Sequence, residues 1–594
     1  MRAWWNALLG WLRSRRVNRD TLLMIVAAAV GAGSALGVVV FYKAIDFAYA
    51  LFFRIPGEHV SRSVFAAYRP LITALGFMTA WLLMRRIGRG AQGMNVPDVQ
   101  LAVARRGGYL SVRTATARTA ASAVTLGSGG SAGSEGPVAV LGSTIGSWVG
   151  RTMKLDSSAV NVLVASGAAA GIAAAFNAPL AGAFFALEEI LVAFSVVAFA
   201  PVVISSVVGA IISRAFFGNH PAFPIPAEYG YSFSAEIFLL HPLLGVICGL
   251  VAVLFIRTYF RMHEVGERYR HRPVLMAAAA GALVGVLVFL SHGVLVGYGH
   301  LAVRVEVFGR MAWYSLALLA LGKILATSLT VNLGGSGGVF TPSLYIGAAT
   351  GGAFGVAMRE LFPQLQIAPE AYALVGMAAV VAAATAAPIT AILIVFEMTN
   401  DYAIMPALMM VVAIASVVTK RLEPDSLYSG YLRRRGEIVP KHAQADVLST
   451  MRVAEMVEPA APIAQDTPLE HVLGRVAANG AMDIPVVNAA NVAIGMIRVN
   501  DIERLTREER MAGRLILAAD LAVQTEVVLP HDLLFSAFQK MEQSGVNTLP
   551  VINADSGELL GVVTRRGIIE VYQERISHNE TDATKAPTLP LFPG

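Results

Sequence analysis

Long apolar runs recur along most of the chain, and they constrain its fold more than any other feature. Examples are residues 22–41, 71–84, 243–256, 275–290 and 407–418. With 56% apolar residues over a length of 594 and a mean hydropathy of +0.61, the chain has more apolar surface than a soluble core of ordinary domain size can bury. We therefore predict an integral membrane protein that is surrounded by a lipid bilayer.

Several of these runs are shorter than the roughly 20 residues that a full membrane crossing requires. Short hydrophobic segments interrupted by glycine are typical of broken or half-spanning helices, whose ends are tolerated only where they line a protected cavity. Complete helices that tilt or kink are the alternative interpretation.

Residues 1–20 form a basic N-terminal segment. Its arginines are Arg2, Arg13, Arg15, Arg16 and Arg19. No small-residue cleavage site follows the short apolar run at 3–11, so a cleaved signal peptide is not expected. Under the positive-inside rule this segment stays cytoplasmic, and the bacterial inner (plasma) membrane is the expected location. The net charge of +6 is explained by this segment and by arginines 433–435 rather than by nucleic-acid binding.

The sequence changes character near Glu423, where the long apolar runs end and charged residues alternate with short Val, Ile and Leu clusters. We predict a transmembrane domain at 21–437, a linker at 438–450, and two soluble domains at 451–510 and 511–577. The tail at 578–594, which is rich in Thr, Pro and Asp, is expected to be disordered.

The transmembrane part is predicted to be duplicated. The stretch SGAAAGIAAAFNAPLAGAFFALEE around Pro179 matches GMAAVVAAATAAPITAILIVFEM around Pro388, and GSEGPVAVLGSTIGSWVG matches GVFTPSLYIGAATGGAFG upstream of them. Paired repeats in transporters place the binding site at the repeat interface near the membrane midplane. The residues alone leave open whether the repeats are parallel or inverted. We expect a polytopic α-helical domain with inverted repeats and broken helices.

The soluble part is also repeated. MDIPVVNAANVAIGMIRVNDIERL aligns with NTLPVINADSGELLGVVTRRGIIEVY, and each contains a strand, a turn, a second strand and the start of a helix. Two copies of a small βαββα unit predict a pseudo-symmetric α+β pair.

The segment GSGGSAGSEGP, at 127–137, has the composition of an anion site. Glycine allows backbone N–H groups to approach an ion, and Pro137 suits the first turn of a helix. The start of such a helix offers unpaired N–H donors and a partial positive charge. Glu135 lies at this start, and its carboxylate can occupy the site of a permeating anion, so it is a candidate gate. A glycine-rich packing motif with an incidental glutamate is the alternative.

The second copy, GGSGGVFTP from Gly334, has Phe340 where the first has Glu135. It is expected to bring a second helix start to the anion without a competing carboxylate. Taken alone, this segment is also compatible with ordinary helix packing.

Glu188 and Glu189 end the apolar run at 181–187. A carboxylate within the membrane is costly and is a functional candidate by default. Glu188 is repeated in Glu397, so we interpret it as architectural, satisfying helix ends or a subunit interface. Glu189 has no counterpart, since Met398 stands at the matching position, and it is the better candidate for a proton relay. A position at a helix end facing cytoplasmic water is the alternative.

Four motifs in order, GSEGP, GGVFTP, FNAPLAG with its EE pair, and APITAI with FEMT, resemble the CLC chloride channel and transporter family across 21–437. The soluble pair resembles CBS domains. The resemblance implies that Glu135 is the external gating glutamate and Glu189 the internal proton glutamate. It also implies a homodimer with one pore per subunit. The residues that it places near the anion are Met94, Asn95, Ser134, Gly136, Val339, Phe340, Ile346 and Tyr428.

Two positions depart from the family pattern. Met94 stands in GMNVP where the family's GSGIP has a serine, and a thioether cannot donate the hydrogen bond of a hydroxyl. Ser134 stands where the family often has an arginine, which weakens the positive field at the outer mouth. Fluoride-exporting relatives also depart from serine at the first position, whereas GGVFTP, Tyr428 and the CBS pair resemble the chloride branch.

CBS pairs often bind adenine nucleotides through a Thr or Ser and an Asp, and neither copy has the complete set. The second copy has Thr564 but Gly567 in place of the Asp, while the first has Asp501 but Arg498 in place of the Thr. An adenine nucleotide is therefore a candidate cofactor of the pair. A structural or dimer-stabilising module is the alternative.

Other functional classes fit less well. A metalloprotease needs H-E-x-x-H, and the near match HEVGE from His263 lacks the second histidine, so an enzyme is not expected. A divalent-cation transporter needs clustered membrane carboxylates, and the single cysteine, Cys248, leaves no thiol metal site. A passive, voltage- or pH-gated chloride channel of the same fold is the nearest alternative, but channels of the family frequently lack the internal glutamate. A fluoride- or nitrate-selective exchanger is a further alternative.

We predict a chloride/proton antiporter in which Glu189 passes protons to Glu135.

Overall fold

The computed structural model describes the following residues: 19–58, 68–88, 95–191, 196–219, 239–296, 311–437, 451–478, 483–498, 516–523, 525–544, 546–554 and 556–571. The chain divides into two compact units, Met1–Val439 and Pro440–Gly594. Met94, Asp501, the basic segment up to residue 18, the predicted linker and the predicted tail lie outside the described residues.

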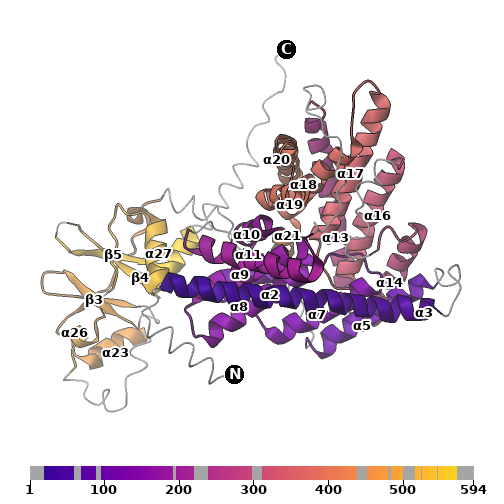
Figure 1. Ribbon diagram of the computed structural model, residues 1–594. Coiled ribbons are helices and arrows are strands. Elements are labelled where there is room, and N and C mark those ends of the chain that lie inside the picture. The colour runs from indigo at the N-terminus through magenta and orange to yellow at the C-terminus, as the bar shows by residue number, and fades with distance from the viewer. Residues whose placement is uncertain are drawn as a thin grey trace. The chain divides into compact units, whose positions relative to one another are not determined.

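The described part of the first unit is built from helices (Figure 1). They are α2 (Arg19–Tyr49), η1 (Ala50–Arg54), α3 (Ile55–Gly57), α5 (Arg69–Arg86), α6 (Val96–Arg105), α7 (Val112–Gly127), α8 (Glu135–Thr152), α9 (Ser157–Phe176), α10 (Pro179–Phe185), η2 (Ala186–Ile190), α11 (Val196–Phe217), α13 (His241–Arg268), α14 (Pro273–Leu290), α16 (Trp313–Asn332), α17 (Phe340–Leu361), α18 (Pro369–Thr385), α19 (Pro388–Thr399), α20 (Met405–Leu422) and α21 (Leu427–Arg434).

Among the described residues, 7 helices are long and apolar enough to cross a membrane. Others are much shorter: α6 has 10 residues, α10 has 7, α19 has 12 and α21 has 8. The predicted mixture of spanning and broken helices is therefore present. Some apolar runs belong to longer helices than their hydropathy suggests, since the run 243–256 lies within α13, which has 28 residues.

Glycines bring the central helices of each repeat into backbone contact. A Cβ atom added at Gly142 of α8 would lie 2.0 Å from the carbonyl oxygen of Gly167 in α9. A Cβ atom added at Gly347 of α17 would lie 2.2 Å from the carbonyl oxygen of Gly376 in α18. These two glycine pairs are matched in the sequence alignment of the repeats, so the two copies pack their central helices in the same way.

The two repeats also cap each other's helices. The carboxylate of Glu397, in α19, accepts hydrogen bonds from the backbone N–H groups of Leu180 and Ala181 at the start of α10, at 2.9 and 2.8 Å. The carboxylate of Glu188, in η2, accepts bonds from the backbone N–H and hydroxyl of Thr390 at the start of α19, at 2.9 and 2.7 Å. This exchange satisfies helix ends, as the sequence interpretation of the two glutamates proposed.

The second unit contains two small sheets. The first has the order β1 (Ile463–Ala464), β2 (Ile484–Val487), β3 (Ala493–Ile497), and the second pairs β4 (Thr548–Ile552) with β5 (Leu559–Thr564). The helical elements are η3 (Val453–Met456), α23 (Leu469–Ala478), α26 (Ala518–Leu521) and α27 (Leu534–Ser544). The antiparallel pairs β2–β3 and β4–β5 each carry one register irregularity, between Val486 and Val487 and between Val551 and Ile552. This correspondence agrees with the predicted internal repeat.

Candidate functional site

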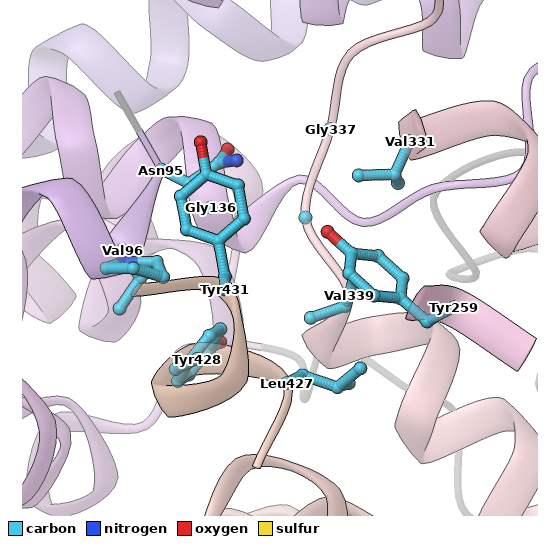
Figure 2. Close-up of a pocket in the computed structure, with 12 residues that line it drawn as sticks. Asn95, Val96, Gly136, Tyr259, Val331, Gly337, Val339, Leu427, Tyr428 and Tyr431 are labelled. Atoms are coloured by element: carbon cyan, nitrogen blue, oxygen red, sulfur yellow. The ribbon is translucent and has the colours of Figure 1, made fainter. Parts of the chain in front are cut away.

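Residues from the beginnings of several helices line one pocket in the first unit (Figure 2). The lining residues are Asn95, Val96, Pro97, Gly136, Tyr259, Val331, Gly337, Gly338, Val339, Leu427, Tyr428 and Tyr431. They come from the starts of α6, α8, α17 and α21 and from α13 and α16. Because the first N–H groups of a helix have no partner within it, such a pocket is suited to an anion.

Glu135 lies in the first turn of α8 and is 2% exposed. Its carboxylate accepts hydrogen bonds from the hydroxyl of Ser134 at 2.9 Å and from the backbone N–H of Thr341 at 3.2 Å. The hydroxyl of Thr341 donates a further bond to it. Since Thr341 belongs to the first turn of α17, the carboxylate sits where that helix start would hold an anion.

This arrangement corrects one expectation. We expected the second glycine-rich segment to present a helix start without a competing carboxylate, but Glu135 reaches across and occupies it. The reach is possible because the two segments pair: the N–H and carbonyl groups of Gly133 and Gly338 exchange bonds of 2.8 and 2.7 Å. A Cβ atom added at Gly136 would lie 3.1 Å from the Cα atom of Gly338. The two helix starts are therefore in direct contact.

The start of α6 is held by charged groups. Asp98 accepts a hydrogen bond from the backbone N–H of Asn95 at 2.8 Å and forms an ion pair of 2.6 Å with Arg435, which follows α21. The side-chain oxygen of Asn95 accepts a bond from Arg118 of α7. Asn95 therefore lines the pocket, and its side-chain oxygen is already hydrogen-bonded to Arg118.

Tyr428 is placed by a short, capped helix. The hydroxyl of Ser426 accepts a hydrogen bond from the backbone N–H of Ser429 at 3.2 Å, and the Ser429 hydroxyl accepts one from Ser426 at 2.9 Å. A Cβ atom added at Gly430 would lie 2.6 Å from the ring of Phe260, so α21 rests closely on α13. These contacts hold the Tyr428 ring against the pocket.

The other residues expected near the anion take different positions. Val339 and Gly136 line the pocket, while Ser134 bonds to Glu135 instead. Phe340 is buried, with its ring centroid 5.9 Å from that of Phe176 and 6.2 Å from that of Phe185. Ile346 is fully buried in α17. The pocket described above does not include Phe340 or Ile346.

Glu189 lies in the π-helical turn η2 and is fully buried. The side-chain amide of Gln100, in α6, donates to its carboxylate at 2.8 Å and to its carbonyl oxygen at 2.7 Å. The alternative interpretation, in which Glu189 faces cytoplasmic water at a helix end, is therefore wrong. Its neighbour Glu188 points to α19, so the π-turn sends two consecutive carboxylates to different partners.

Sequence reasoning missed several buried polar side chains of the first unit. Lys323 is fully buried in α16, where its ammonium donates to the carbonyl of Leu295 at 3.2 Å and lies 5.2 Å from the ring centre of Tyr345. The rule that found Glu189, an ionisable group inside an apolar helix, would also have found Lys323. Gln100 and Tyr259 carry no comparable signal, because neither is charged and neither stands in a repeated motif.

Thr564, the candidate nucleotide-binding residue of the second copy, is 2% exposed at the end of β5. Its hydroxyl donates to the carboxylate of Glu458 at 2.8 Å and accepts a bond from the backbone N–H of Gly567 at 3.0 Å. The hydroxyl expected to meet a phosphate therefore already meets an anionic side chain.

Helix starts from both repeats meet around this pocket, in a protein whose described part has 7 helices long and apolar enough to cross a membrane. The family model described as voltage gated chloride channel matches residues 76–420, and a CBS domain model matches residues 521–574. The chain belongs to the voltage-gated chloride channel family and carries a C-terminal CBS domain.

Known relatives agree with this assignment. A putative chloride channel protein ClcB-like from Ralstonia nicotianae is 33% identical over 370 residues, which cover 62% of this chain and 86% of that protein. The H(+)/Cl(-) exchange transporter ClcA of Yersinia pestis is 30% identical over 444 residues, which cover 72% of this chain and 91% of that protein. The crystal structure of a eukaryotic CLC transporter matches with a TM-score of 0.66 at 21% identity, over 92% of this chain and 97% of that one. The resemblance and the fold class predicted from the sequence are confirmed.

Proposed function

We propose that this protein is a chloride/proton antiporter in which Glu135 is the gate. The observation that carries the proposal is the position of the Glu135 carboxylate, which accepts bonds from the backbone N–H and hydroxyl of Thr341 at the start of α17. An ionised carboxylate competes with chloride for this place, and a protonated one leaves it. That competition couples anion movement to proton movement, since the two cannot occupy the place together.

Glu189 supplies the internal step of the proton route in this proposal. Its burial in the first unit and its hydrogen bond from Gln100 support this role, because a buried carboxylate with a donor can both hold and release a proton. Tyr428, Val339 and the start of α6 form the anion path. The name of the ClcA relative, an H(+)/Cl(-) exchange transporter, supports coupled exchange.

A passive chloride channel is the second candidate, because the ClcB-like relative is described as a putative chloride channel protein. The buried Glu189 favours exchange over this candidate. We further propose that the protein is a homodimer in the bacterial inner membrane. The basic segment at the N-terminus supports an orientation with the N-terminus and the C-terminal unit in the cytoplasm.

The test is proton uptake by liposomes that contain the purified protein and are driven only by a chloride gradient. Uphill proton movement with chloride is the expected result. Chloride flux without proton movement would favour the channel, and proton movement with fluoride or nitrate but not with chloride would reassign the anion. Empty liposomes with the same gradient are the control for leakage.

A further inference from the structure

Tyr259 of α13 contributes a hydroxyl group to the pocket. Its side chain lines the pocket, and the residue is 5% exposed. Figure 2 shows its hydroxyl turned toward the chain at Gly337, with Tyr428 and Tyr431 on the other side of the pocket. Within the described ranges, this hydroxyl makes no hydrogen bond. The residue is buried, but its hydroxyl is not among the described polar atoms that are both fully buried and without a partner, so it opens onto the pocket, where a bound group can accept its hydrogen bond.

The ring of Tyr259 is held in place by its neighbours. The centroid of the Phe260 ring lies 5.3 Å away at an interplanar angle of 84°, and that of Phe255 lies 6.5 Å away at 82°. Both are edge-to-face contacts of the kind that aromatic side chains prefer. The hydroxyl is thus preorganised and needs no ordering when a ligand arrives.

Tyr428 offers the comparison for this residue. It lines the same pocket, is 6% exposed, and its hydroxyl also lacks a hydrogen-bond partner among the described residues. The third tyrosine differs, because the hydroxyl of Tyr431 accepts a bond of 3.4 Å from Arg435. Tyr259 and Tyr428 therefore meet the same physical requirements for donating to a bound anion, although they come from different helices.

We propose that Tyr259 is a further anion ligand, whose hydroxyl donates directly to the transported anion from the side of the pocket opposite Tyr428. This inference rests on the proposed function. It also offers a replacement for the hydroxyl donor that is missing at Met94, where the family pattern has a serine. A donor from α13 supplies a hydrogen bond to the same small anion, and a hydrogen bond to a charged group is among the stronger ones.

The experiment measures chloride binding to the purified, detergent-solubilised full chain by isothermal titration calorimetry. Tyr259→Phe removes only the hydroxyl, and Tyr428→Phe is the parallel variant. Tyr269→Phe is the matched control, because Tyr269 follows the same helix but is 50% exposed and lies outside the pocket lining. We expect Tyr259→Phe to raise the chloride Kd about tenfold and Tyr269→Phe to leave it unchanged.

Tyr259→His adds a readout that loss of packing alone would not give, since it restores an N–H donor on a ring. Binding tighter than in Tyr259→Phe is expected. A Tyr259→Phe protein that binds chloride as the wild type does would overturn this inference and leave the antiporter proposal intact. A wild-type protein that binds neither chloride, nitrate nor fluoride would overturn both.

Discussion

The carboxylate of Glu135, in the first turn of α8, accepts a hydrogen bond of 3.2 Å from the backbone N–H of Thr341, in the first turn of α17. The two residues belong to different repeats and are 206 positions apart. The Glu135 carboxylate of one repeat therefore rests on the helix start of the other, at the interface between the repeats.

Glu135→Ala removes the competing carboxylate. We expect chloride flux that continues and no longer responds to pH, together with loss of coupled proton transport, because nothing titratable then contends for the anion place. The measurement is chloride and proton flux in liposomes over a series of buffers from neutral to acidic pH. Proton transport that stays fully coupled in this variant would exclude Glu135 as the gate.

Thr341→Val keeps the shape of the side chain but removes the hydroxyl that donates to Glu135. We expect the equilibrium between the bound and the displaced Glu135 carboxylate to shift up to about tenfold toward the displaced form, because a hydrogen bond to a charged group is lost. Chloride flux at neutral pH should therefore rise. Thr350→Val is the matched control, because the Thr350 hydroxyl donates within α17 to the carbonyl of Ile346 at 2.8 Å. Equal effects of the two substitutions would contradict the explanation.

Glu189→Ala is expected to stop proton movement while chloride flux persists, because the internal carrier is lost and the anion pocket is left intact. Gln100→Leu tests the amide that holds Glu189. It should reduce proton transport by a smaller factor, because the carboxylate remains but its position is no longer defined. Simultaneous recording of both fluxes separates these effects. Unchanged proton transport in Glu189→Ala would rule out the relay.

Glu188→Ala and Glu397→Ala remove equivalent caps from α19 and α10. Each is expected to lower the free energy of unfolding by about 1 to 2 kcal/mol, the usual range for loss of a helix cap. Only Glu188→Ala should also change the ratio of chloride to protons, because Glu188 is next to Glu189 in the π-turn. Thermal unfolding in detergent and flux ratios in liposomes give the two readouts. A change of ratio in Glu397→Ala would show that the cap, rather than proximity to Glu189, controls coupling.

Adenine nucleotides are expected to bind the C-terminal unit weakly or not at all, because the Thr564 hydroxyl already donates to the Glu458 carboxylate. A phosphate there would face a like charge at close range. Titration of ATP and AMP into the full chain should give no binding heat at millimolar concentration. Glu458→Gln removes the charge and keeps the size, so it is the variant in which binding should first emerge. Tight binding to the wild type would restore the nucleotide role.

Local features of the sequence predicted a large part of the fold. Apolar runs marked the spanning helices, and the paired motifs around Pro179 and Pro388 revealed the duplication, because both signals depend on neighbouring residues. The local setting of Glu135, between Gly133-Ser134 and Gly136-Pro137, predicted that it lies at a helix start, and it lies in the first turn of α8. Helix lengths were harder to predict, since α13 extends well past its apolar run into polar residues.

By itself, the sequence determined the membrane class, the two repeats, the second unit and the glutamates that deserve testing, since each depends on composition or on residues close in the chain. Only the tertiary structure decided that Glu135 rests on α17, that Gln100 holds Glu189, and that Tyr259 faces the pocket. These contacts join segments far apart in the sequence. No local pattern encodes them, because they depend on how helices distant in the sequence pack against one another.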